Sequence, residues 1–444
     1  MTNILNELNL DNGTNYKINT LKKYSNNEDL KRLLKMTYDK VAFTYGVTMK
    51  NVPEVKLYSG KNSLTYALTV LEKDLATRNV TGNAAIDLVY RTLCSLSSEN
   101  AKIIEKVLDR DLKINMGRTN INKVFKNLII KPPYERCDIG TEKNLKALNF
   151  SDGVYAQVKI DGTYRSSTVD NENVIIMSRT GNEDVFPIIE RDIKTFNISG
   201  YTLIGEMTLR GEKDRKKGNG LINSDNPPHN DIIYTVWDMI PNQEYSMTKD
   251  QIKVSSKKGL LQRYEDRFEI LKTLPFTDNV RLIEYKILDN ITDVYKYFQE
   301  VTKRGDEGII AKSKNLTWKD GTSKEQLKIK LQFEVDVRIT GFVEGKKGTK
   351  REETFGSITY STDDGKLQGS VSGFTDKELE DFNSRRDELI GKVMEVEAND
   401  ITQARGSETY ALSHPRFIKL RDKDQTDTIK RAMKSLENSM TLKI

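Results

Sequence analysis

The chain has 444 residues, which is too long for a single hydrophobic core, so about three domains of roughly 100–200 residues are expected. Hydrophobic residues make up 36% and charged residues 31%, and no apolar run approaches the ~20 residues that a membrane span needs. The first residues also lack a basic region followed by an apolar core, which excludes a secretory signal and predicts a soluble, cytoplasmic protein with no membrane partner.

The formal net charge of +6 is unevenly distributed along the chain. Residues 1–130 contain 20 Lys and Arg against 13 Asp and Glu, whereas the rest of the chain contains 51 against 52. A local basic excess is the usual footprint of contact with nucleic-acid phosphates, although a solvated lysine-rich surface is the alternative. The two cysteines and two histidines lack the paired spacing of a zinc site, so no structural metal or disulfide framework is expected.

Residues 1–130 show the apolar spacing of helices, for example at Leu30, Leu33 and Leu34. Helix-start patterns occur at 80–86 and 116–122, and helix N-termini can bind phosphate through free backbone N–H groups. Ordinary capping is the alternative, but arginines lie beside both patterns. The candidates for DNA backbone contact are Arg78, Gly82, Asn83, Arg110 and Arg118.

Two further domains are expected after this α-helical DNA-binding domain. Two prolines in residues 131–138 indicate an interdomain linker. Residues 131–333 alternate short strand patterns with helical stretches, which predicts an α+β domain with antiparallel sheets around a pocket. Residues 334–444 are almost entirely strand-like with a polar helix near 375–390, which predicts an all-β OB-fold.

The sequence QVKIDGTYR at 157–165 places Lys159 at the end of a predicted strand, just before an Asp161-Gly162 turn. A lysine at the rim of a pocket becomes a nucleophile when its surroundings favour the neutral amine. Alone, this pattern also fits a surface lysine before a hairpin turn. Motifs later in the chain are needed to decide between these two interpretations.

Five further segments occur in a fixed order: SRTGN at 178–182, LIGEM at 203–207, YTVWD at 234–238, DEGIIAK at 306–312 and LKIKL at 327–331. With the first motif, they resemble the nucleotidyltransferase motifs of ATP-dependent DNA ligases. Residues 75–89 and 107–125 resemble the N-terminal domain of bacteriophage DNA ligases of the T-even type. The resemblance thus covers nearly the whole chain and implies sealing of nicked double-stranded DNA.

The resemblance implies a role for each matching residue. Lys159 would carry AMP, Glu206 and Glu307 would hold Mg²⁺, and Trp237 would stack on the purine. The remaining residues implied in ATP or AMP binding, besides Glu206 and Trp237, are Gln157, Asp161, Gly162, Tyr164, Arg165, Arg179, Lys328, Lys330, Arg421 and Lys423. NAD-dependent ligases carry a four-cysteine zinc module that is missing here, so ATP is the expected cofactor, and the protein is expected to act as a monomer.

The chain departs from the family pattern at three places. The arginine of K-x-D-G-x-R is replaced by Tyr164, and Arg165 cannot be assumed to replace it because neighbours on an extended chain point to opposite faces. An arginine before the last pair of lysines is replaced by Thr322 or Ser323. The C-terminal motif around Arg421 is irregular. An RNA ligase or capping-type transferase, and a catalytically decayed DNA-binding protein, remain the alternatives.

Overall fold

The computed structural model describes residues 1–171, 173–212, 214–347, 349, 351–403 and 406–440. Its internal contacts divide the chain into two compact units. The first unit contains Met1–Pro132 with the short later segments Thr180–Glu183 and Lys347–Lys350, and the second contains the other residues. The further division of the second unit at 333/334 remains a prediction. Among the described residues, no helix is long and apolar enough to cross a membrane.

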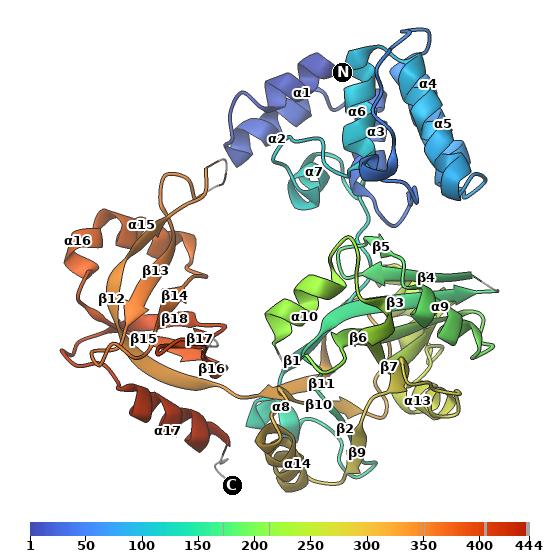
Figure 1. Cartoon of the computed structure of the whole chain (residues 1–444). Helices are drawn as coiled ribbons and strands as arrows, with labels where there is room; N and C mark the ends of the chain where they lie inside the picture. Colours follow the sequence, from blue (N-terminus) through green and yellow to red (C-terminus); the bar gives the residue numbers. More distant parts are fainter. Residues whose placement is uncertain (172, 213, 348, 350, 404–405, 441–444) are drawn as a thin grey trace. The chain divides into compact units, whose positions relative to one another are not determined.

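The first unit is built from helices (Figure 1). They are α1 (Thr2–Leu8), α2 (Thr14–Lys23), α3 (Glu28–Tyr38), α4 (Leu64–Val70) continued by a π-helical turn at Leu71–Leu75, α5 (Gly82–Ser95), α6 (Ser98–Leu108) and α7 (Arg118–Val124). Side-chain caps start several of them. Asn27 accepts a hydrogen bond from the Leu30 N–H at the start of α3, and Ser97 caps α6 in the same way.

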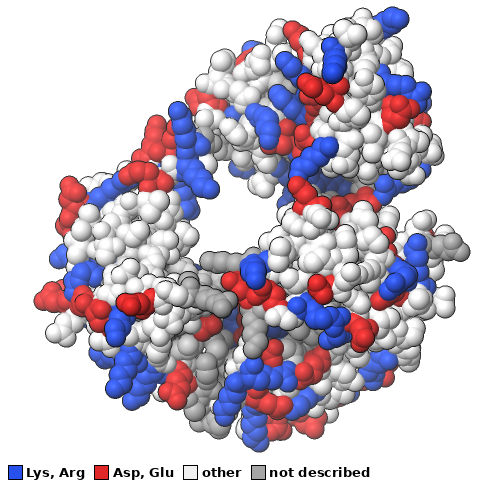
Figure 2. All heavy atoms as spheres, in the orientation of Figure 1, with Lys and Arg blue, Asp and Glu red and all other residues white. Residues whose placement is uncertain are grey.

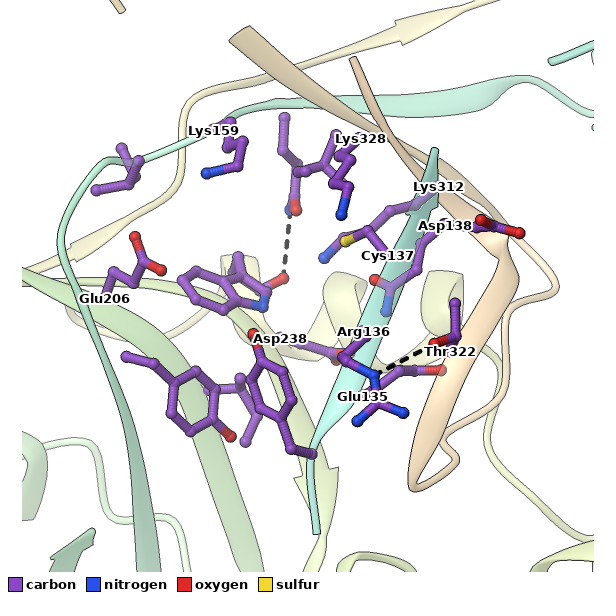
Figure 3. A pocket seen from close by; sticks show the side chains of 18 of the residues that line it. Glu135, Arg136, Cys137, Asp138, Lys159, Glu206, Asp238, Lys312, Thr322 and Lys328 are labelled. Carbon is purple, nitrogen blue, oxygen red and sulfur yellow. Dashed lines mark hydrogen bonds between the residues drawn. The ribbon is translucent and has the colours of Figure 1, made fainter. Parts of the chain in front are cut away.

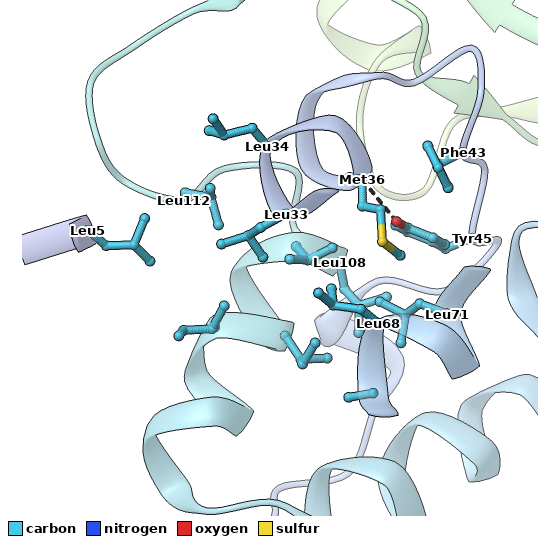
Figure 4. Close-up of a cluster of buried hydrophobic side chains, with 14 of the residues drawn as sticks. Leu5, Leu33, Leu34, Met36, Phe43, Tyr45, Leu68, Leu71, Leu108 and Leu112 are labelled. Carbon is cyan, nitrogen blue, oxygen red and sulfur yellow. Dashed lines mark hydrogen bonds between the residues drawn. The ribbon is translucent and has the colours of Figure 1, made fainter. Parts of the chain in front are cut away.

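A single hydrophobic cluster holds these helices together (Figure 4). Leu33 and Leu34 of α3 are fully buried, as the apolar spacing predicts, and they pack with residues such as Leu68 and Leu108 from other helices. Tyr45 adds a polar contact inside the cluster, because its hydroxyl donates to the Met36 carbonyl at 2.9 Å. The helices of this unit therefore share one core.

Arg110 is used inside this unit, in contrast to the DNA contact expected from the sequence. Its guanidinium donates to the carbonyls of Met36, at 3.0 Å, and of Phe43. It also lies 4.2 Å from the centre of the Tyr45 ring. These three contacts point the charged group at the protein interior, so it joins the loop around Phe43 to α3 and does not face outward for phosphate.

The second unit contains a five-stranded sheet in the order β1-β11-β10-β2-β9. Its strands are β1 (Glu135–Ile139), β2 (Val154–Val158), β9 (Tyr285–Leu288), β10 (Gly308–Ser313) and β11 (Gly321–Lys330). All neighbours are antiparallel except β1, which runs parallel to β11. Helix α14 (Ile291–Lys303) packs on this sheet with the buried residues Val294, Phe298 and Val301.

The second unit also contains a six-stranded sheet in the order β5-β4-β3-β6-β7-β8. Its strands are β3 (Thr163–Asp170), β4 (Asn173–Ser178), β5 (Glu183–Asp184), β6 (Tyr201–Leu209), β7 (Ile232–Pro241) and β8 (Val280–Leu282). Helices α9 (Pro187–Lys194) and α13 (Tyr264–Lys272) contribute buried residues to its core. The chain enters this sheet directly after Lys159, so that lysine lies at the junction of the two sheets.

The prediction that residues 131–138 form an interdomain linker is partly wrong. Residues after the two prolines form β1, which pairs with the edge of β11 in the register Arg136↔Thr322. The strand is short and polar, so its apolar alternation is too weak to be read from sequence. Pairing with the edge of β11 therefore determines the extended conformation of β1.

The C-terminal part is a five-stranded antiparallel sheet in the order β14-β13-β12-β15-β18, with a separate β16-β17 pair. Its strands are β12 (Phe333–Glu344), β13 (Phe355–Ser361), β14 (Gln368–Val371), β15 (Val393–Ala398), β16 (Asp400–Gln403), β17 (Tyr410–Ser413) and β18 (Arg416–Arg421). A parallel bridge between Ser372 and Arg416 joins the two end strands. The sheet therefore curves back on itself around its own core.

The other helices of the second unit lie at the sheet surfaces and ends (Figure 1). They are α8 (Glu142–Lys146), α10 (Arg215–Ile222), α11 (Asn242–Tyr245), α12 (Lys249–Lys257), α15 (Asp376–Ser384), α16 (Arg386–Leu389) and α17 (Ile429–Met440). Helices α15 and α16 fall where one polar helix was expected. Thr375 and Glu378 form a capping box at the start of α15, which explains its position.

The internal role of Arg110 predicts a stability effect. Arg110→Ala removes two charged hydrogen bonds and a cation–π contact, and should lower the free energy of unfolding by about 2–3 kcal/mol. Urea unfolding of the full chain, followed by circular dichroism, measures this. Arg118→Ala is the matched control, because Arg118 is exposed on α7 and should change stability by less than about 0.5 kcal/mol. Equal effects of the two substitutions would contradict the internal role.

Candidate functional site

Lys159 follows β2 directly and is held by the strand opposite. Its backbone N–H donates to the Gly308 carbonyl at 2.8 Å, and Val158 pairs with Ile309. This register places the Lys159 amine against the Glu307 carboxylate, with which it forms an ion pair. Segments almost 150 residues apart in the chain thus meet because β2 and β10 are neighbours.

The charge on Lys159 reflects two opposing effects. Burial lowers the pKa of its amine, but the carboxylates of Glu307, Glu206 and Asp161 more than offset this, so the pKa lies above its ordinary value. The amine is therefore stored as an ammonium ion. A reaction at this nitrogen first needs its proton and its ion pair to be removed.

Glu206 lies on the six-stranded sheet, where β6 pairs with β3. Its Oε2 accepts the Gly162 N–H at 3.0 Å. Gly162 allows this close approach, because a Cβ there would lie 2.4 Å from the Met207 carbonyl oxygen. Burial raises the pKa of Glu206 to about 7, although Lys159 works in the opposite direction.

Asp161 completes the group of carboxylates near Lys159. It forms an ion pair with Arg215 of α10 at 2.8 Å, and Arg215 also lies 3.0 Å from the His414 ring nitrogen. Burial and Glu307 raise the pKa of Asp161, while Arg215 partly compensates. Arg215 and His414 were not recognised from sequence as neighbours of this site. Arg215 lies in a polar segment with no motif, and His414, at the start of the C-terminal segment around Arg421, was expected to be a loop or packing residue.

A cavity of about 480 Å³ opens between the two sheets (Figure 3). Aromatic rings of Tyr134, Tyr164 and Trp237 form part of its wall, and Ile160, Ile204, Ile240 and Ile310 add apolar surface. Lys159, Glu206 and Lys328 also line it (Figure 3). The cavity therefore combines a flat apolar wall with a charged rim, which suits a molecule with a ring system and phosphates.

Seven residues singled out from the sequence line this cavity: Gln157, Lys159, Tyr164, Arg179, Glu206, Trp237 and Lys328. Gln157 donates from Nε2 to the Trp237 carbonyl at 3.2 Å and to the Tyr264 hydroxyl at 2.5 Å. Arg179 stacks over the Tyr134 ring at 4.4 Å. Lys330 instead lines a smaller neighbouring cavity of about 120 Å³, together with Lys328 and Arg416.

Tyr164 and Arg165 are separated by the alternation of β3. The Tyr164 ring makes an edge contact with Tyr134, at 4.8 Å between ring centres, inside the cavity wall. Arg165 points the other way, where it pairs with Asp184 at 2.9 Å and donates to Asn223 at 2.6 Å. The structure thus brings the tyrosine to the cavity but leaves the arginine buried elsewhere.

Arg421 and Lys423 do not line the nucleotide-sized cavity. Arg421 pairs with Asp336 and Glu395 at 3.4 Å each, and Lys423 pairs with Asp336. These four residues border a separate hollow of the C-terminal part. Their positive charges are therefore occupied by protein carboxylates in this conformation.

The remaining DNA-binding candidates lie on the surface of the helical unit. Gly82, with φ of 60°, and Asn83 are exposed on the first turn of α5, and Arg118 is the exposed first residue of α7. Arg78 is paired with Glu183. Figure 2 shows Lys and Arg interspersed with Asp and Glu on the visible face, so the basic excess does not form one uniform patch there.

Several residues of the cavity were given no role from the sequence, although Lys312 and Asp238 end the DEGIIAK and YTVWD segments. Glu135 and Cys137 of β1 and the buried Lys312 of β10 line it, together with Asp238. Asp238 is saturated by Arg267, whose guanidinium donates to both carboxylate oxygens at 2.9 and 3.0 Å. Glu135 is an isolated acidic residue after two prolines, so no pattern in the sequence marks it as part of a site.

The described residues contain no group of three or more His, Cys, Asp or Glu arranged to hold a metal ion. Glu206, on β6, and Glu307, just before β10, both lie near Lys159: Glu307 forms an ion pair with its amine, and both carboxylates raise its pKa. Two carboxylates without a full protein cage fit Mg²⁺, which keeps several waters and binds substrate phosphates. They do not fit a permanently bound structural metal.

A family model described as the ATP dependent DNA ligase domain matches residues 135–330, which include both walls of the cavity. The DNA ligase of Enterobacteria phage T4 is 26% identical over 96% of this chain and 96% of its own, and the DNA ligase of phage T6 gives the same values. Residues 135–330 of this chain therefore form an ATP dependent DNA ligase domain. A DNA ligase from Archaeoglobus fulgidus is 30% identical over 35% of this chain and 32% of its own.

Solved structures share the fold of this ligase. The structure named Pmar-Lig_PreS3 covers 95% of this chain and 99% of its own, with a TM-score of 0.56 and 20% sequence identity. The structure named Pmar-Lig_Pre. gives the same TM-score. The arrangement of helices and sheets is therefore shared over almost the whole length of this ligase.

The ion pair at Lys159 predicts how its amine reacts. Glu307→Gln removes the largest effect that raises the Lys159 pKa, so burial should lower it and increase the neutral fraction at pH 8. Labelling of Lys159 by an amine-specific acylating reagent, followed by mass spectrometry, should then be several-fold faster. The exposed Lys61 serves as an internal control. Unchanged or slower labelling of Lys159 would contradict the assigned cause.

Proposed function

We propose that this ligase seals nicks with 3′-hydroxyl and 5′-phosphate ends in duplex DNA, through a lysyl-AMP at Lys159 and a DNA-adenylate. The observation that carries the proposal is a half-buried lysine held by Glu307 at the charged rim of a cavity that has an aromatic wall. Such a site offers a nitrogen nucleophile, carboxylates and a place for a base. The expected cofactors are ATP and Mg²⁺.

The first step joins Lys159 to the nucleotide. The neutral amine attacks the α-phosphorus of ATP, a P–N bond forms, and the P–O bond to the β-phosphate breaks so that pyrophosphate leaves. A 5′-phosphate oxygen of DNA then displaces Lys159, and the 3′-hydroxyl finally displaces AMP. All three steps are in-line phosphoryl transfers, for which positioning and charge neutralisation supply most of the catalysis.

Mg²⁺ neutralises phosphate charge when it is bound, and Glu206 and Glu307 are the residues that would hold it. Glu307 has a second effect, because it keeps Lys159 protonated in the free enzyme. Engagement of Glu307 elsewhere would release the amine for attack. Binding of the substrate and activation of the nucleophile are thereby linked through one carboxylate.

Other cations complete the proposed site. Lys328 and Arg179 border the cavity and would contact phosphate or the bound nucleotide, with Lys330 beside them. Arg421 and Lys423 would orient pyrophosphate, for which they must exchange Asp336 and Glu395 for phosphate oxygens. The C-terminal part would therefore act in more than one arrangement during the reaction.

The proposed organisation has three domains: a helical DNA-binding domain at 1–130, an adenylation domain at 131–333 and an OB-fold at 334–444. The bridge between Ser372 and Arg416 supports the OB-fold, because it closes the sheet. Gly82, Asn83 and Arg118 remain the exposed candidates for the DNA backbone. We further propose that the protein works as a monomer in the cytoplasm.

Replacement of Lys159 tests the nucleophile. Lys159→Arg should abolish the covalent AMP adduct formed from α-labelled ATP, because a guanidinium stays protonated and cannot attack. Lys312→Arg is the matched control and should still form the adduct. An adduct on the Lys159 variant that survives denaturing electrophoresis would refute the assignment. Sealing of nicked duplexes with DNA or RNA on either side of the nick then tests the substrate, and sealing of RNA ends alone would favour an RNA ligase.

The carboxylates predict a metal dependence. Glu206→Ala and Glu307→Ala should each slow lysyl-AMP formation by about a hundredfold or more at low Mg²⁺, because the ion that neutralises the phosphate is misplaced. Titration with Mg²⁺ and Mn²⁺ in single-turnover assays measures this, and partial recovery at high metal concentration is expected. Near-normal rates for both variants at low Mg²⁺ would exclude them as metal ligands.

A further inference from the structure

The cavity has a polar wall that the proposed chemistry leaves without a function. Figure 3 shows Glu135 on the side of the cavity away from Lys159. Lys159 has to reach the α-phosphorus, so the phosphates belong near it and the base of the nucleotide extends toward the other side. Glu135 therefore borders the space in which the base would lie.

Glu135 differs from the other carboxylates of the cavity wall. Asp238 is saturated by Arg267, Glu206 accepts the Gly162 N–H, and Asp138 accepts the Ile139 N–H. By contrast, the Glu135 Oε1 is shielded from solvent and makes no hydrogen bond within the described part of the chain. Buried polar atoms are nearly always paired in native proteins, which suggests that a ligand supplies the missing partner.

The surroundings of Glu135 decide its protonation. Burial is the largest effect and raises the pKa of Glu135 to about 8, although Arg267, Lys312 and Lys319 favour the carboxylate. At neutral pH the group is thus mostly a carboxylic acid, with one hydrogen-bond donor and one acceptor. Gln157 is not available to donate a hydrogen bond to the base, because its Nε2 already donates to the Trp237 carbonyl and the Tyr264 hydroxyl.

A neutral carboxyl group is complementary to the Watson–Crick edge of adenine. Adenine presents the N6 amine as a donor next to N1 as an acceptor, so a carboxylic acid can accept from N6 and donate to N1. An ionised carboxylate can only accept, so it cannot donate to N1. We propose that Glu135, in its protonated form, pairs with the Watson–Crick edge of adenine and strengthens the binding of ATP at this site. This inference rests on the proposed function of the cavity.

Substitution of Glu135 separates recognition from chemistry. Single-turnover lysyl-AMP formation by the full chain should show that Glu135→Ala raises the KM for ATP about tenfold or more at pH 7 and lowers the rate at saturating ATP by a smaller factor. Glu135→Gln keeps a donor and an acceptor, so it should largely restore the KM. A KM within twofold of wild type for Glu135→Ala, or an equal loss for Glu135→Gln, would overturn the proposal.

The pH dependence provides a readout that a purely structural role would not change. Between pH 7 and pH 9 the wild-type KM for ATP should rise up to about tenfold as Glu135 ionises, relative to Glu135→Gln, whose amide does not titrate. Titration of Lys159, Glu206 and Cys137 affects both proteins and cancels in this ratio. A constant ratio would overturn the proposal even if Glu135→Ala fails to fold.

The proposed function itself can fail independently. If the wild-type protein forms no adduct from α-labelled ATP at any pH, the site is not an adenylating one and the Glu135 assignment falls with it. If the adduct forms but the KM ratio between wild type and Glu135→Gln does not change with pH, only the assignment of Glu135 is wrong.

Discussion

The pairing of β2 with β10 is the constraint on which the site depends. Its register sets Val158 against Ile309, and therefore places Lys159 beside Glu307. The backbone hydrogen bond from Lys159 to Gly308 fixes the same alignment. A shift of one residue in this pairing would place the Lys159 and Glu307 side chains on opposite faces of the sheet and separate the amine from the carboxylate. The lysine that we propose as the nucleophile and its carboxylate partner are thus positioned by main-chain contacts, with little dependence on flexible side chains.

The same geometry keeps the Lys159 amine protonated. Glu307, Glu206 and Asp161 hold it as an ammonium ion, although burial favours the neutral amine. In the proposed reaction these carboxylates serve the resting state as well as the metal, and the amine becomes nucleophilic when phosphates and a cation redirect them.

The departures from the family pattern have local structural explanations. Tyr164 stands where an arginine is typical and packs its ring against Tyr134, which extends the aromatic wall of the cavity. Thr322 or Ser323 stands where a basic residue is typical, and Arg136 of the neighbouring strand donates from Nε to the Thr322 hydroxyl at 3.2 Å. A cation is therefore present beside that position, although it comes from β1.

The sequence alone determined the motifs and most of the elements that carry them, whereas the tertiary structure decided which groups meet. Strands β2, β6, β7, β10 and β11 fall where short apolar patterns predicted them, and the helices before residue 130 follow their apolar spacing. Local patterns succeed here because these elements bury one face in a core, which leaves a periodic signal. Glu135 has no motif and Lys312, at the end of DEGIIAK, had no predicted role, and only the pairing of their strands with β11 brings them to the cavity wall. Arg110 and Arg165 look like available cations in the sequence, yet folding turns both toward internal acceptors. Burial, hydrogen-bond partners and electrostatic environment depend on residues distant in the chain, so no local pattern can specify them before the sheets have formed and their registers are set.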